Sequence, residues 1–163
     1  MRKKKIYLDT TVISHLQHED KPEWMADTLE LWEILKTGKY DVYISDVVMA
    51  ELMRCPEPKL SELLTLLDDV RYTEIKVESN AEILALAAEV KKLNLIPPKS
   101  ENDRRHIAAA LYGGCSIIVS WNFNHFVTEK TIDGVRQICF ENHIKPVDIY
   151  APTILLERSG DNG

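Results

Sequence analysis

The stretch Ile6-Tyr7-Leu8-Asp9-Thr10-Thr11 carries the strongest fold signal in the chain. Three apolar residues in succession are typical of a strand that is buried on both faces of a sheet. Asp9 ends the apolar run, and the polar side chains that follow favour the start of a helix. The stretch therefore predicts a strand over Lys5 to Leu8, with Asp9 at the carboxyl end of that strand.

Outward from this strand, strand-like and helix-like segments alternate along the chain. Short runs rich in β-branched and aromatic residues predict further strands at 40–45, 72–77, 116–119 and 147–151. Apolar residues at helical spacing predict helices at 24–37, 46–54, 59–67, 81–93, 101–112 and 132–142. This alternation predicts an α/β fold of three layers, α/β/α, with a central parallel sheet. We expect a single domain over residues 1–155 and a flexible tail over 156–163.

The composition, with 45% hydrophobic and 28% charged residues, is that of an ordinary globular protein. No stretch is long and apolar enough for a membrane span or a signal peptide, so we expect no membrane contact and a cytoplasmic location. The cysteines are odd in number and lack metal-ligand spacing, which favours free thiols.

The net charge of the chain is unfavourable for binding a polyanion. The formal charge is −6, and setting aside the four basic residues at positions 2–5 leaves −10 for the remainder. Affinity for nucleic acid comes mainly from Lys and Arg side chains that neutralise phosphates. An RNA substrate would therefore require bound cations and a local basic rim.

Two acidic residues stand where a carboxylate is either useful or costly. Asp9 follows a buried strand, at the edge where open α/β sheets bind ligands, although a helix cap is an equally good reading. Glu51 falls on the helix face that carries Val47 and Val48 into the core, so its charge needs a metal or a cationic partner. The alternative for Glu51 is an ion pair at the edge of the core, with Arg54 or a distant lysine.

Asp103 lies on the apolar stripe of its predicted helix, in the first turn. Because Ser100 precedes it by three residues, a capping box is the alternative reading. Several inward carboxylates at one sheet edge repel each other, and a hard divalent cation such as Mg²⁺ or Mn²⁺ relieves that repulsion. Such a cation can generate a nucleophile from bound water for phosphodiester hydrolysis.

Four segments, in this order along the chain, resemble the motifs of the PIN-domain family: IYLDTTVI at 6–13, SDVVMAEL at 45–52, NDRRHIAAA at 102–110 and IIVSWNFNHF at 117–126. The resemblance implies a parallel sheet flanked by helices and a ribonuclease that depends on Mg²⁺ or Mn²⁺. Asp9, Glu51 and Asp103 match the family's first three acidic positions, which implies that they hold the metal. Small bacterial members are mostly VapC-type toxins of toxin-antitoxin pairs. The resemblance thus implies an endoribonuclease toxin with an antitoxin partner.

The fourth acidic position of the family is occupied here by Asn122, which we include in the expected catalytic set. Its amide can offer a carbonyl oxygen or hold a metal-bound water, but it contributes no charge. Its neighbours Ser120, Asn124 and His125 are expected to be loop or capping residues. The departure keeps open a catalytically weakened PIN domain that binds RNA or protein.

Another alternative is a phosphatase of the haloacid dehalogenase class, which would carry a second Asp where Thr11 stands.

For the partner, we expect an antitoxin segment to lie on the helix that begins near Trp24, with Trp24, Trp32 and Leu35 as apolar anchors. The same region is expected to support a homodimer.

Overall fold

The computed structural model describes residues 2–161 and contains a sheet of five parallel strands. The strands stand in the order β3-β2-β1-β4-β5. Their bounds are Lys5–Leu8 (β1), Asp41–Ser45 (β2), Tyr72–Ile75 (β3), Ile117–Val119 (β4) and Asp148–Tyr150 (β5). The predicted α/β class and the parallel sheet are confirmed.

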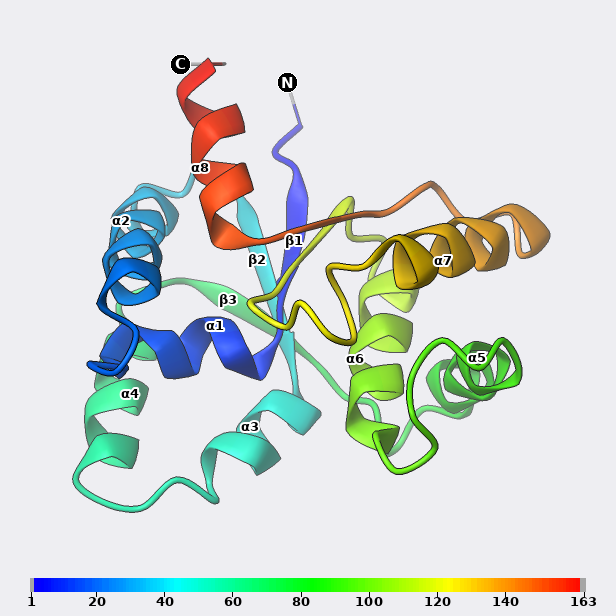
Figure 1. Cartoon of the computed structure of the whole chain (residues 1–163), viewed down its shortest axis with the longest axis horizontal. Helices are drawn as coiled ribbons and strands as arrows, with labels where there is room; N and C mark the ends of the chain where they lie inside the picture. The colour runs from blue at the N-terminus through cyan, green and yellow to red at the C-terminus, as the bar shows by residue number, and fades with distance from the viewer. Residues whose placement is uncertain (1, 162–163) are drawn as a thin grey trace.

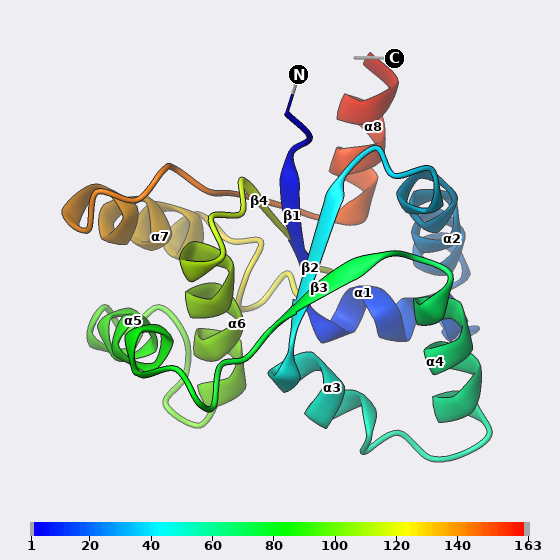
Figure 2. The same cartoon turned by 180° about the vertical axis from the view of Figure 1, so that it is seen from behind.

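Helices cover both faces of the sheet, so the molecule has three layers (Figures 1 and 2). One face carries α1, α2, α4 and α8, and the other carries α5, α6 and α7. The short helix α3 lies at the edge where the strands end. The helices span Thr10–Ser14 (α1), Pro22–Lys36 (α2), Asp46–Leu52 (α3), Lys59–Asp68 (α4), Ala81–Lys92 (α5), Glu101–Tyr112 (α6), Glu129–Glu141 (α7) and Pro152–Asp161 (α8), and a 3-10 turn follows α1 at His15–Gln17 (η1).

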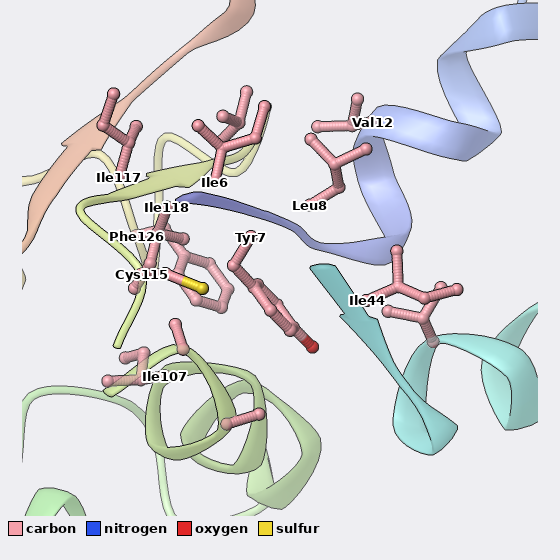
Figure 3. Packing of buried hydrophobic residues seen from close by; sticks show 14 of the residues in the cluster. Ile6, Tyr7, Leu8, Val12, Ile44, Ile107, Cys115, Ile117, Ile118 and Phe126 are labelled. Carbon is pink, nitrogen blue, oxygen red and sulfur yellow. The ribbon is translucent and has the colours of Figure 1, made fainter. Parts of the chain in front are cut away.

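The central strand β1 is buried on both faces, as its apolar run predicts. Ile6, Tyr7 and Leu8 have no exposed surface. Figure 3 shows Ile6 and Leu8 on one side of the strand and Tyr7 on the other, where its ring extends toward α6. Since successive side chains of a strand point to opposite faces, this one strand takes part in both halves of the core.

The chain order reverses beside β1. Strands β2 and β3 lie on one side of it, and β4 and β5 lie on the other. Crevices at such reversals, beyond the carboxyl ends of the strands, are where open α/β sheets bind ligands. Asp9 directly follows β1 and Ser120 directly follows β4, so the sequence places polar side chains at this point.

The C-terminal segment differs from the predicted flexible tail, because residues 156–161 continue the helix α8. Leu155 is buried, and the hydroxyls of Ser159 and Tyr40 form a hydrogen bond of 2.5 Å. These contacts hold the helix against α2 and the start of β2 (Figure 1). Residues 156–161 are therefore helical where a flexible tail was expected, and residues 162–163 lie outside the described part of the chain.

Helix α2 also departs from one expectation. Trp32 and Leu35 are only 1% and 2% exposed, and Trp32 Nε1 donates a hydrogen bond of 2.8 Å to the Leu66 carbonyl oxygen. Both side chains therefore pack α2 onto the core. The prediction that they anchor a partner was wrong, because their surfaces are not accessible. Of the helices described within residues 2–161, none has the length and apolar character to cross a membrane.

Candidate active site

Asp9 is a buried carboxylate that is held by neutral donors. Its side chain is 2% exposed. Oδ1 accepts hydrogen bonds from Thr11 Oγ1 at 2.5 Å and from the Val12 amide at 3.3 Å, and Oδ2 accepts one from Ser120 Oγ at 2.5 Å. Asp9 thus caps α1, as one reading predicted, while the hydroxyls orient both of its oxygens. Burial raises the pKa of Asp9, and the charge of His106 and these donors only partly offset that effect.

Glu51 points from α3 toward the same edge of the sheet. Its Oε1 accepts hydrogen bonds from Thr10 Oγ1 at 2.7 Å and from His106 Nε2 at 2.6 Å. Partial burial acts to raise the pKa of Glu51, but the hydrogen bond and charge of His106, aided by Thr10, outweigh it and lower the pKa. Glu51 thus has His106 as a direct hydrogen-bond partner, while Arg54 contributes only its charge.

Behind Glu51, a chain of hydrogen bonds runs into the core. His106 Nδ1 lies 2.7 Å from the Tyr7 hydroxyl, which in turn lies 2.8 Å from Ser45 Oγ. Figure 3 shows the Tyr7 hydroxyl directed into the space between β2 and α6. Burial raises the pKa of Tyr7 well above its usual range, and the hydrogen bond with Ser45 opposes this effect. The network gives every polar atom of the Tyr7 and His106 side chains a partner, which is the usual condition for burying such groups.

Asp103 is positioned at the first turn of α6 and forms a hydrogen bond with His125. The distance from Asp103 Oδ2 to His125 Nδ1 is 2.6 Å. The alternative of a capping box is not realised, because Ser100 makes no capping hydrogen bond with its side chain. His125, predicted as a loop residue, instead connects the loop after β4 to α6.

Asn122 shapes that loop. Its Oδ1 accepts hydrogen bonds from the backbone amides of Asn124 at 3.0 Å and His125 at 2.8 Å. The backbone amide of Asn122 donates to Ser120 Oγ at 2.9 Å. Because Ser120 also donates to Asp9, a continuous path of hydrogen bonds runs from Asp9 through the loop to Asp103. The side-chain oxygen of Asn122 was predicted to bind a metal or a metal-bound water. In this structure it accepts hydrogen bonds from the backbone.

The three acids thus lie just after β1 (Asp9), on α3 (Glu51) and in the first turn of α6 (Asp103). Their oxygens are the donors that a hard divalent cation prefers. Glu51 and Asp103 are each paired with a histidine, and across residues 2–161 no three His, Cys, Asp or Glu side chains are grouped as a metal centre. The donor types of Asp9, Glu51 and Asp103 fit Mg²⁺ or Mn²⁺.

The comparisons with known proteins agree with the fold. A search of solved structures finds similarity to VapBC2 from Rickettsia felis bound to a DNA fragment from their promoter. The TM-score is 0.57 at 15% identity, over 90% of this chain and 98% of that chain. No curated protein sequence matches the chain. The family model described as PIN domain matches residues 6–125. Because this match covers well over half of the sequence, the chain belongs to the PIN-domain family.

Proposed function

We propose that the protein is a metal-dependent endoribonuclease that hydrolyses RNA phosphodiester bonds at the edge formed by Asp9, Glu51, Asp103 and Asn122. PIN domains are a family of nucleases. The observation that carries the proposal is the placement of Asp9, which is buried at the reversal of strand order with only neutral donors around it. A buried carboxylate without a direct cationic partner is costly unless a cation is supplied.

Asp9, Glu51 and Asp103 would hold the Mg²⁺ or Mn²⁺ ion. When bound there, such an ion supplies charge neutralisation at the phosphodiester and a water of lowered pKa. Thr11 and Ser120 orient the two oxygens of Asp9, and Thr10 orients Glu51. The carboxylates accept hydrogen bonds, so His106 Nε2 and His125 Nδ1 carry protons that hold Glu51 and Asp103 in place.

The proposed role is that of the toxin of a type II toxin-antitoxin pair. Support comes from the PIN-domain membership and from the similarity in fold to the VapBC2 assembly of R. felis. We accordingly propose RNA as the substrate and an antitoxin protein as a partner, and we retain a homodimer and a cytoplasmic location as proposals.

A second candidate is a PIN domain that binds RNA or protein without cutting it. Its supporting observations are the two histidine-carboxylate pairs and the engagement of Asn122 Oδ1 by backbone amides. In that case the same edge would bind a ligand through its polar groups without metal-dependent chemistry.

Cleavage assays separate the two candidates. Purified protein is incubated with mixed RNAs in Mg²⁺, in Mn²⁺ and in chelator, and the fragments are quantified. Asp9→Asn, Glu51→Gln and Asp103→Asn should each lower the Mg²⁺-dependent rate by about two orders of magnitude or more, because several kcal/mol of charge stabilisation depend on the bound ion. Asp133→Asn is the matched control, since Asp133 lies exposed on α7.

Circular dichroism should show that all four variants keep the wild-type fold. Turnover near the wild-type rate in any two of the three site variants would refute the assignment of the site. RNA binding without cleavage in either metal would instead favour the binding module.

A further inference from the structure

A cluster of aromatic side chains lies next to the acidic edge. The rings of Trp24, from α2, and Trp121, from the loop after β4, stack at a centroid distance of 4.7 Å and an angle of 6°. The ring of Phe123 lies 5.5 Å from that of Trp24 and is tilted by 50°. Trp121 is buried and Trp24 is partly buried, whereas Phe123 is 46% exposed. We refer to Trp24, Trp121 and Phe123 as the aromatic platform.

The platform is tied to the candidate site by direct hydrogen bonds. The backbone amide of Trp121 donates to Thr11 Oγ1 at 2.9 Å, and the same hydroxyl donates to Asp9 at 2.5 Å. Trp121 Nε1 donates to Thr28 Oγ1 on α2 at 2.9 Å, which fixes the indole in the core. Trp121 is therefore joined to Asp9 through Thr11, and the exposed ring of Phe123 lies against the Trp24 ring that stacks on Trp121.

A basic side chain lies on the platform, although the chain as a whole is acidic. Lys21 Nζ lies 4.0 Å from the centre of the Trp24 ring, above its face. Burial lowers the pKa of His15, the hydrogen bond with the Thr11 carbonyl oxygen opposes that effect, and the charges of His18, Lys21 and Lys59 add to it. Arg54 similarly adds its charge to the surroundings of Glu51. Within residues 2–161, none of Lys21, Arg54 and Lys59 forms an ion pair with a carboxylate.

The protein surface beside Lys21 also forms a depression. An open depression of about 330 Å³ is lined by Lys21, Pro22, Glu23 and Trp24. Basic side chains next to exposed aromatic rings are the combination that binds single-stranded nucleic acid, because the rings stack on bases while the cations contact phosphates.

Building on the proposed ribonuclease function, we propose that one unpaired base of the RNA substrate stacks on Phe123 beside Trp24, while Lys21 contacts an adjoining phosphate. The bases of a duplex already stack on each other, so only a single-stranded segment can offer a free base to the ring. A protein partner is the less suitable occupant. One half-exposed ring among exposed polar residues is a small apolar area compared with the anchors of protein interfaces.

Binding assays in chelator test the platform without metal-dependent cleavage. A fluorescently labelled single-stranded RNA, and the same RNA annealed into a duplex, are titrated with wild type, Phe123→Leu, Phe123→Trp and Phe140→Leu. Phe123→Leu keeps the apolar volume and removes the ring, while Phe123→Trp keeps a ring. Phe140→Leu is the matched control, because Phe140 on α7 is 84% exposed. Quenching of tryptophan fluorescence by the RNA gives a second readout of stacking.

Phe123→Leu should weaken single-strand binding by about fivefold or more, which is the usual effect of losing one base-aromatic stack. Phe123→Trp and Phe140→Leu should bind as the wild type does, and the duplex should be insensitive to Phe123→Leu. Wild-type single-strand affinity in Phe123→Leu, or equal losses in Phe123→Leu and Phe140→Leu, would overturn the platform and leave the patch to a protein partner.

The two proposals fail in different ways. If Phe123→Leu cleaves RNA with the wild-type KM and rate, the ribonuclease stands and the platform is wrong. If wild type never cleaves RNA but binds single strands through Phe123, the ribonuclease is wrong and the platform describes a binding site.

Discussion

Asp9 and Glu51 lie at the same edge of the sheet, yet their surroundings shift the two pKa values in opposite directions. Burial raises the pKa of Asp9, whereas His106 and Thr10 overcome burial and lower the pKa of Glu51. The difference arises because Glu51 has a direct basic partner, while Asp9 receives hydrogen bonds from hydroxyls and one amide. One carboxylate opposes folding as it ionises, and the other supports it.

This contrast predicts opposite pH dependences of stability. The raised pKa of Asp9 means that the folded state loses stability as the pH rises from about 4, the ordinary Asp value, through the folded pKa. The lowered pKa of Glu51 means that its contribution is fully present above about 4.3, the ordinary Glu value, and is lost as the pH falls through the folded pKa. Urea unfolding of wild type, Asp9→Asn and Glu51→Gln over a pH series in chelator measures both effects.

The expected result is a pair of slopes with opposite sign. The unfolding free energy of wild type relative to Asp9→Asn should fall with rising pH, and relative to Glu51→Gln it should rise. Asp133→Asn, at an exposed position, should give a nearly flat difference. Equal signs for Asp9 and Glu51 would contradict the environments described above.

The acidic residues could be singled out as candidates because a charge on an apolar helix face or at a strand end stands out in the sequence. Their histidine partners could not. His106 stands three residues after Asp103 and is 2% exposed, so a titratable ring on the apolar stripe was the available signal. Its pairing with Glu51 joins residues 55 positions apart, and only the packing of α3 against α6 shows it.

At the scale of elements, replacing a glycine by alanine is predicted to have opposite effects on stability in α7, at Gly134, and in α8, at Gly160. A Cβ on Gly134 would meet the Leu95 side chain, with its Cγ at 3.0 Å and its methyl groups closer still, whereas one on Gly160 would meet nothing within 4 Å. Alanine favours a helix by up to about 1 kcal/mol over glycine, but overpacking costs about 1–3 kcal/mol. Gly134→Ala should therefore destabilise the protein, and Gly160→Ala should stabilise it by about 0.5 kcal/mol.

Thermal melts check both signs, with melting temperatures expected to move by a few degrees or less. The Gly160 variant also tests the end of the chain. If residues 156–161 were a flexible tail, Gly160→Ala would leave the melting temperature unchanged.

Elements with a strong local signal were predictable in type and place. The bounds of β1 and α6 agree with the expectation, and α7 begins only three residues earlier, at Glu129, because Thr128 caps it. The end of α8 was not predictable from local pattern. Part of its stabilisation comes from the hydrogen bond between Ser159 and Tyr40, which are 119 positions apart.

At the scale of the whole molecule, a formal charge of −6 opposes the binding of RNA. The acidic edge adds to that repulsion at the place where the substrate would lie. Lys21, Arg54 and Lys59 form no ion pair within the described residues 2–161, so their charges remain for phosphates. Binding of single strands should consequently depend on a few local contacts rather than on a general basic surface.

The salt dependence of RNA binding measures how many phosphates are contacted by basic side chains. Each neutralised phosphate of a single strand contributes about −0.7 to the slope of log affinity against log salt concentration, so three basic side chains predict a slope of about −2. Lys21→Gln should reduce the slope by about 0.7 units. Lys36→Gln, at the other end of α2, should leave it unchanged, since Lys36 is already paired with Glu33 at 2.9 Å. Titrations in chelator at several salt concentrations give the slopes, and equal effects of the two lysine variants would show that Lys21 makes no specific phosphate contact.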